Sequence, residues 1–265
     1  MNSPEFEKAT VKAIEDCSGA VKNCAKNSIL HLRKAHKVKS IDKEMAALGA
    51  ITAEEEAASS LFYCLKNRQY KNAGHLSFRS HVHKQALYPF IQSVSIFLER
   101  VSKIDKFPFE EFRLSHVETD GRNAIKLGLK LKNHDGYIEP IPPLHFTMFD
   151  SKNGPVTFEE EFQEIVTDQA FKNVKKYIKN IANQRNLLLY ANNSGLPEVK
   201  GDINRYLEEQ KNKVLIILNL ILLIDPWRDE GLSLFVQQAL DSFLIILDKL
   251  DHSEMTIQTS VTKNA

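Results

Sequence analysis

The chain has 265 residues, 43% of them hydrophobic and 26% charged, which is typical of a soluble globular protein and excludes a collagen-like or disordered chain. Its net charge is +1, and its three cysteines are too few for a disulfide framework, so we expect a reducing compartment. No apolar leader is visible, and the longest apolar run, 214–224, is shorter than the roughly 20 residues of a spanning helix. We therefore expect a cytoplasmic protein with no membrane segment.

The first hundred residues have the apolar spacing of amphipathic helices. Residues 5–37 are predicted to form a long helix, and Ser40 to be the N-cap of a second helix that ends near Gly74. A third helix is predicted over 86–104. Pro89 should kink or restart it, because proline has no amide hydrogen to donate.

The middle of the chain changes to the two-residue period of a strand. Residues 125–131 alternate between apolar and polar side chains, and residues 112–118 precede them as a second strand. Asp120-Gly121 between them is a hairpin-turn signal. Short strands at 137–138 and 144–149 complete a predicted small antiparallel sheet.

Helical spacing returns in the last part of the chain. Thr157–Glu160 has the pattern of a capping box, and another helix is predicted to start near Asp202. That helix includes the apolar run 214–224, which we expect to be buried or to lie at a subunit interface. Asp225-Pro226 has the pattern of a helix start and predicts a final helix to about residue 250.

The predicted fold is therefore mainly α, a helical bundle with a small antiparallel β-sheet insertion. Its predicted parts are an N-terminal helical part (1–106), the β insertion (107–152), a C-terminal helical part (153–252) and a frayed tail (253–265).

Charge is segregated along the chain. Residues 57–98 contain no acidic residue, residues 22–43 are also strongly basic, and the last quarter of the chain is acidic. Such segregation concerns the partners of a protein rather than its fold. It predicts either a surface that attracts phosphate groups, or a solvated helix face or subunit contact without such a role.

The densest polar cluster combines three glutamates, 54–56, with the basic residues and histidines that follow. A metal site on His81 and His83 is disfavoured, because residues two apart on a helix point about 200° from each other. We therefore predict no metal, and the chain has none of the familiar nucleotide-binding motifs, so we predict no cofactor.

The residue types of this cluster suit metal-independent RNA cleavage. A histidine with a pKa near neutrality can take the proton of the 2′-OH, and an arginine can hold the phosphate in a bidentate manner. Arg68 with His75, and Arg79 with His83, are the candidate pairs. The alternative is a soluble basic turn without a catalytic role.

The order AITAEEEAASSLF on one helix and HLSFRSHVHKQAL at the start of the next resembles the AbiV family of abortive-infection proteins and, more distantly, the HEPN superfamily. The resemblance covers residues 51–89. It implies a helical bundle around a long antiparallel hairpin, commonly a homodimer that cleaves RNA without a metal ion in phage defence or toxin–antitoxin pairs.

The superfamily's signature is an arginine followed after four to six residues by a histidine. Arg68 and His75 fit this spacing and Gln69 fills the usual polar position, whereas Arg79 and His83 are too close together. The resemblance also implies an acidic pair and a His-Lys step, which map to Glu55 with Glu56 and to His83 with Lys84.

The leading hypothesis is an RNA-binding protein or metal-independent ribonuclease of an antiviral defence or toxin system, acting as a homodimer with an antitoxin or another protein partner. The candidate residues are His75 or His83 as the base, Arg68 or Arg79 on the phosphate, Glu55 and Glu56 as orienting groups, and Lys66, Lys71 and Lys84 on the RNA. The alternative hypothesis is a non-catalytic helical adaptor whose basic half binds an acidic partner.

Overall fold

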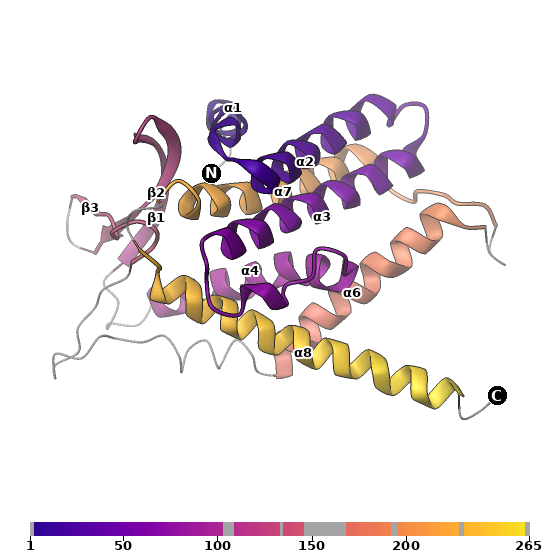
Figure 1. The fold of residues 1–265 in the computed structure, drawn as a ribbon. Coiled ribbons are helices and arrows are strands. Elements are labelled where there is room, and N and C mark those ends of the chain that lie inside the picture. Colours follow the sequence, from indigo (N-terminus) through magenta and orange to yellow (C-terminus); the bar gives the residue numbers. More distant parts are fainter. Residues whose placement is uncertain are drawn as a thin grey trace.

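The computed structural model describes residues 3–102, 109–132, 135–145, 168–191, 195–227 and 231–262. The chain is mainly α with a small antiparallel sheet, which confirms the predicted fold class (Figure 1). In chain order the described elements are α1 (Pro4–Ala13), the short 3-10 helix η1 (Ile14–Asp16), α2 (Gly19–Val38), α3 (Lys43–Asn67), the 3-10 helix η2 (Ala73–His75), α4 (His81–Ser102), β1 (Phe109–Thr119), β2 (Arg122–Leu131), β3 (Tyr137–Ile138), α6 (Asp168–Leu189), α7 (Ile203–Ile224) and α8 (Leu234–Thr262).

The helix predicted over residues 5–37 is broken into α1 and α2. Cys17 and Ser18 have extended backbone, and Gly19 follows with a φ of +55°. Glycine adopts this left-handed conformation at little cost because it has no Cβ. The break lets α1 change direction and contact both α7 and the sheet.

Helices α2 and α3 form a close antiparallel hairpin (Figure 1). The N-cap of α3 is Asp42 rather than Ser40, because its Oδ1 accepts a hydrogen bond from the backbone N–H of Met45 (2.8 Å). Near the other end of the hairpin, the buried Ser60 hydroxyl donates to the carbonyl of Val21 (2.7 Å). The hairpin is therefore joined by polar contacts as well as by its apolar face.

Helix α3 ends at Asn67, before the predicted end at Gly74, because Gln69 and Asn72 have positive φ angles of 61° and 66°. Helix α4 contains Pro89 without ending there, so the proline does not restart the helix.

The sheet has the order β1-β2-β3, with antiparallel neighbours. The predicted turn is confirmed, since Asp120 and Gly121 have φ angles of 49° and 70° between β1 and β2. Leu144 is not part of a strand, and residues 141 and 145 form an isolated bridge. Positions 146–149 of the predicted last strand lie outside the described residues.

The sheet is attached to the helices by both polar and apolar contacts. The carboxylate of Asp16, in η1, accepts hydrogen bonds from the backbone N–H of Asn123 (2.8 Å) and from its side-chain amide. These bonds lower the pKa of Asp16. Ile125 and Leu129 of β2 are fully buried.

In the last part of the chain, the predicted helix starts are confirmed at one place and wrong at another. Asp202 caps α7 by accepting from the N–H of Asn204 (2.8 Å). Asp225 is the C-cap of α7 rather than the start of the next helix, and Ser233 caps α8 by accepting from the N–H of Val236 (3.2 Å). The Thr157–Glu160 capping box lies outside the described residues, and α8 extends beyond the predicted end to Thr262.

One hydrophobic core joins the three predicted parts of the chain. It contains residues of α2, α3, α4, β2, α6, α7 and α8. The apolar run 214–224 of α7 is largely buried inside this core, so its composition is explained within a single chain. No helix in the described part of the chain is both long and apolar enough to span a bilayer.

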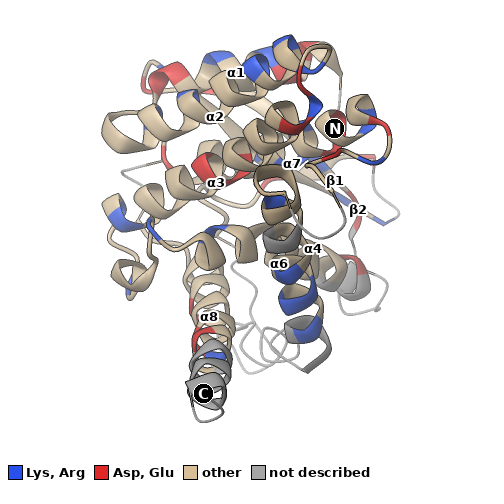
Figure 2. Cartoon of the chain, turned by 90° about the vertical axis from the view of Figure 1, so that its right-hand side faces the viewer, with Lys and Arg blue, Asp and Glu red and all other residues tan. Residues whose placement is uncertain are grey.

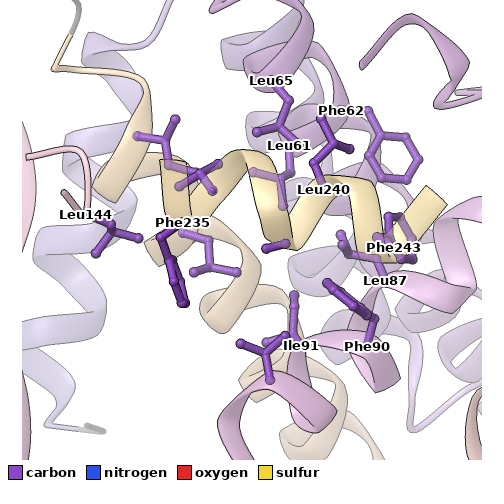
Figure 3. A pocket seen from close by; sticks show the side chains of 15 residues that line it. Leu61, Phe62, Leu65, Leu87, Phe90, Ile91, Leu144, Phe235, Leu240 and Phe243 are labelled. Carbon is purple, nitrogen blue, oxygen red and sulfur yellow. The ribbon is translucent and has the colours of Figure 1, made fainter. Parts of the chain in front are cut away.

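An apolar pocket opens at the side of the core. Figure 3 shows an apolar pocket between α3, α4 and α8, lined by Leu61, Leu87, Phe90, Leu240 and Phe243 among others. Its volume is about 130 Å³, and all its lining side chains are apolar.

Candidate functional site

The segment between α3 and α4 runs back along α3 and determines where α4 begins. The rings of Tyr63 and Phe78 are stacked with their centroids 4.2 Å apart, which holds this segment against α3. The Ser80 hydroxyl then accepts a backbone N–H of the first turn of α4 (3.2 Å) and acts as its N-cap. As a result, α4 starts at His81, directly beside Glu55 in the middle of α3.

Glu55 is a buried carboxylate that receives donors from two helices. His81 Nδ1 lies 2.7 Å from Oε2, and Lys84 Nζ lies 3.3 Å from the same oxygen. Oε1 accepts from Gln85 Nε2 and from Arg185 Nη1, both at 2.9 Å. His81, Lys84 and Gln85 share one face of α4 because they are three and four residues apart. Two cations therefore surround one carboxylate and leave an excess of positive charge.

The imidazole of His81 is the accessible part of this cluster. Its side chain is 55% exposed, whereas that of Glu55 is 7% exposed. Nδ1 also lies 2.8 Å from Arg185 Nη1, but a single nitrogen cannot both donate to Glu55 and accept from Arg185. The carboxylate at 2.7 Å favours the tautomer with the proton on Nδ1. Nε2, on the opposite side of the ring, then carries the lone pair of a base.

Glu54, the neighbour of Glu55 in the chain, has a separate set of partners. The Tyr177 hydroxyl donates to Glu54 Oε1 (3.0 Å), and Lys213 Nζ lies 3.7 Å from Oε2. Lys213 also donates to the Tyr177 hydroxyl (2.8 Å). Burial raises the pKa of Glu54 above its ordinary value despite these partners, and burial with the nearby Glu54 raises that of Tyr177. This network is internal and joins α3 to α6 and α7.

The structure does not bring three of the candidate residues to Glu55. Arg68 is the C-cap residue of α3, and its Nη2 donates to the carbonyl of Gly231 (3.0 Å). His75 and Arg79 are exposed on the segment between α3 and α4. Within the described part of the chain, none of these three side chains contacts Glu55, and no contact joins Arg68 to His75.

His83 is buried, and both of its ring nitrogens are engaged. Nδ1 accepts from the backbone N–H of Ser77 (3.2 Å), and Nε2 lies 3.4 Å from Asp251 Oδ2 of α8. His81 and His83 therefore face different partners, as their spacing on a helix predicted. No group of three or more His, Cys, Asp or Glu side chains is placed to hold a metal ion in the ranges that the structure describes.

The remaining candidates divide between buried and exposed positions. Glu56 accepts a hydrogen bond from the thiol of Cys24, and burial together with this carboxylate raises the pKa of Cys24 to about 11. Lys84 is buried against Glu55, so it is part of the cluster rather than an accessible RNA contact. Lys66 and Lys71 are exposed, and the ammonium of Lys66 lies over the Phe78 ring.

Arg185, Tyr177 and Lys213 are not among the site residues predicted from the sequence. Arg185 is 130 positions from Glu55 in the chain, in a helix rich in Lys, Asn and Gln. One usable signal was the spacing of Arg185, which lies seven residues after Ile178 and four after Ile181 and so falls on the buried stripe of α6. A long polar side chain on such a stripe can reach across to a neighbouring helix.

Comparisons with known proteins give no match: no protein-family model matches the chain, and no curated protein or solved structure is significantly similar to it.

Proposed function

We propose that this protein is a HEPN-like ribonuclease that cleaves RNA without a metal ion, in a phage-defence or toxin system. The observation that carries the proposal is the exposed imidazole of His81, held by the buried carboxylate of Glu55 beside Arg185. The resemblance of residues 51–89 to abortive-infection proteins supports the same class of activity. In this proposal His81 takes the role of the base, which was predicted for His75 or His83, and Arg185 takes the role on the phosphate, which was predicted for Arg68 or Arg79.

The proposed chemistry assigns one task to each group. Nε2 of His81 takes the proton from a ribose 2′-OH, and the 2′-oxygen attacks the adjacent phosphorus. The bond from phosphorus to the 5′-oxygen breaks, and that oxygen takes a proton from water, so a 2′,3′-cyclic phosphate and a 5′-hydroxyl are formed. Arg185 stabilises the charge that develops on the phosphate, while Glu55 fixes the orientation of the imidazole.

RNA degradation in the presence of EDTA tests this assignment. We expect His81→Ala to lower the rate by about 10²- to 10⁴-fold, the usual contribution of a positioned general base. His75→Ala is the matched control, since His75 is exposed and does not contact Glu55. A rate that falls in His75→Ala and not in His81→Ala would instead locate the site at the Arg68 and His75 pair.

The alternative proposal is a non-catalytic adaptor that binds an acidic protein. The exposed basic side chains of Lys66, Lys71 and Arg79 favour it, because they present positive charge without any need for catalysis. Wild-type protein that neither binds nor cleaves any of several RNAs would support the adaptor.

The cytoplasmic location, the homodimer and an antitoxin or other partner remain predictions. The apolar run that first indicated a subunit interface is buried within the chain, so the dimer now depends on the resemblance alone. Light scattering at micromolar concentration tests it, and a monomer would contradict it.

A further inference from the structure

A cleft with a volume of about 670 Å³ lies between α1, α2 and α7. Each of the three helices presents residues at helical spacing to the cleft, and those of α2 are Ile29, Leu32, Arg33, His36 and Lys37. The lining includes none of the side chains that contact Glu55. The cleft is therefore a surface separate from the proposed cleavage site.

The cleft has an apolar lining that is still in contact with water. Leu32, Val214 and Leu218 line it as buried members of the hydrophobic core. Val11 and Leu215 also line it, but they are half-buried and are not among the side chains packed against that core. Apolar surface that stays accessible on a concave face is typical of a binding site.

Basic side chains surround this apolar lining. Lys8 on α1 is exposed, as are Arg33 and Lys37 on α2. Figure 2 shows Lys and Arg along α1 and α2, at the top of the view. Arg33 and Lys37 are four residues apart, so they lie on the same side of α2, about 6 Å apart along its axis. Positive charge therefore reaches the cleft from two different helices.

The two acidic side chains of the cleft do not cancel this charge. Glu7 and Glu208 both pair with Lys211 of α7, at 3.4 and 2.7 Å. The lining therefore carries four full positive charges and two negative ones. Burial and the positive charges of Lys39 and Lys211 lower the pKa of His36 in the same cleft, although Glu208 raises it. A partner that fits this cleft carries negative charge beside an apolar surface.

We propose that the cleft binds an amphipathic helix of a partner protein, with acidic residues on both flanks of its apolar stripe. The stripe contacts the apolar lining, and the acidic flanks face Lys8 on one helix and Arg33 and Lys37 on the other. The lining of α7 covers positions 208–218, about 15 Å, which matches about three turns of a bound helix. This inference goes beyond the ribonuclease and does not depend on it.

Other anionic occupants match these observations less well. Among the described lining residues there is no Phe, Tyr or Trp on which the bases of single-stranded RNA could stack. A bilayer is contacted by apolar side chains that project outward, whereas those of the cleft are recessed between helices. The carboxylate of a fatty acid is a single charge, whereas the cations of the cleft come from two helices.

The test measures the binding of two fluorescein-labelled peptides to the full chain by fluorescence anisotropy. Both peptides have about 16 residues, or four helical turns, with leucine at every third or fourth position. Glutamate flanks the leucines in one peptide and lysine flanks them in the other. We expect the glutamate peptide to bind at least about 10-fold more tightly. The triple variant Lys8→Gln, Arg33→Gln, Lys37→Gln should weaken its binding about 10-fold, the combined effect of losing three exposed ion pairs.

Matched variants show whether the effect belongs to the cleft. Lys12→Gln, Lys34→Gln, Lys43→Gln removes three exposed lysines that do not line the cleft, and it should leave the affinity for the glutamate peptide unchanged. Leu215→Ala should weaken binding about 3- to 10-fold by removing apolar contact surface. Leu30→Ala, at a 44% exposed position outside the cleft, should have no such effect. Urea unfolding confirms that each variant is folded.

Four results would overturn the inference. The first is a glutamate peptide that shows no saturable binding up to about 1 mM, and the second is equal weakening by the two triple variants. The third is self-association of the wild-type chain that the variant of Lys8, Arg33 and Lys37 abolishes, which would make a second copy the occupant. The fourth is displacement of the peptide by 2′-O-methyl RNA or by phosphatidylserine vesicles that bind the wild type but not this variant.

Discussion

Glu54 and Glu55 show how two adjacent residues of the same type acquire different properties. Glu55 has His81, Lys84 and Arg185 around it, whereas Glu54 is held inside the bundle by Tyr177 and Lys213. Desolvation penalises the charged form of a buried carboxyl group, and it outweighs the attraction of Lys213 in Glu54. Glu54 is therefore a structural acid, and its raised pKa connects protein stability to pH.

We predict that Glu54 makes the protein less stable as the pH rises above the ordinary glutamate pKa of 4.5. Its pKa is higher in the folded than in the unfolded state, so the folded state binds more protons in this range. The stabilisation by protonated Glu54 is complete below the pKa of this residue in the unfolded chain, and it is lost as the pH rises through its pKa in the folded protein. Glu54→Gln should remove this contribution, which is at most about 1.4 kcal/mol per pH unit. Urea unfolding between acidic and neutral pH measures it.

Tyr177→Phe should change the pH dependence in the other direction from Glu54→Gln. The Tyr177 hydroxyl donates to Glu54 and lowers its pKa, so its removal should move the loss of stability to higher pH. If Glu54→Gln and the wild type showed the same dependence of unfolding free energy on pH, burial of Glu54 would not control stability.

At this scale the sequence identified the acids but not most of their partners. The three glutamates 54–56 are conspicuous because they interrupt an otherwise apolar helix, and Lys84 follows in the next helix. Arg185 and Lys213 reach the glutamates only because α6 and α7 cross α3 in the folded chain. The spacing of Arg185 places it on the buried stripe of α6, but helical spacing does not show which helix a stripe faces, so the sequence could not pair either residue with the glutamates.

Among the helices, the break between α1 and α2 gives a direct test of a single backbone position. Gly19 has a φ of +55°, and a Cβ added there would meet nothing within 4 Å. Gly19→Ala should therefore lower the free energy of unfolding by about 1–2 kcal/mol through backbone strain alone. Gly74→Ala is the matched control, because Gly74 has the same open space without a positive φ, and its effect should be small. Equal effects of the two variants, measured by urea unfolding, would show that the backbone at Gly19 is not strained by a side chain.

The helices and strands were predictable from the sequence where the spacing of apolar residues alone determines them. A break between two helices was not predictable where the same spacing continues across it. Ala13, Cys17, Val21 and Ala25 are spaced by four residues and are all buried, so the helical pattern continues through the break at Gly19. The start of α8 was misplaced for a related reason. Asp225-Pro226 has the residue types of a helix start, but Asp225 is the C-cap of α7, and Ser233 provides the N-cap of α8.

At the scale of the whole molecule, three aromatic rings link helices that are far apart in the sequence. The ring of Phe243 in α8 lies 6.3 Å from that of Phe62 in α3 and 5.0 Å from that of Phe90 in α4, measured between centroids. The core that they share also includes Ile125 of β2. The sequence could assign each of these side chains to a buried face, but not to a common core, because helical and strand periods give no information on which faces meet.

A common core predicts that the chain unfolds as one cooperative unit. Phe243→Ala should lower the free energy of unfolding by about 3–5 kcal/mol, because it removes a buried ring and leaves a cavity. Trp227, the single tryptophan, has Lys126 of β2 over its ring and so reports on the junction between the sheet and the helices. In Phe243→Ala, the midpoints of the urea transitions followed by Trp227 fluorescence and by far-ultraviolet circular dichroism should therefore both move to lower urea concentration. Ile245→Ala, at a 46% exposed position of the same helix, should shift neither signal appreciably. A fluorescence transition that stayed at its wild-type midpoint in Phe243→Ala, while the circular dichroism moved, would mean that the sheet and α8 unfold separately.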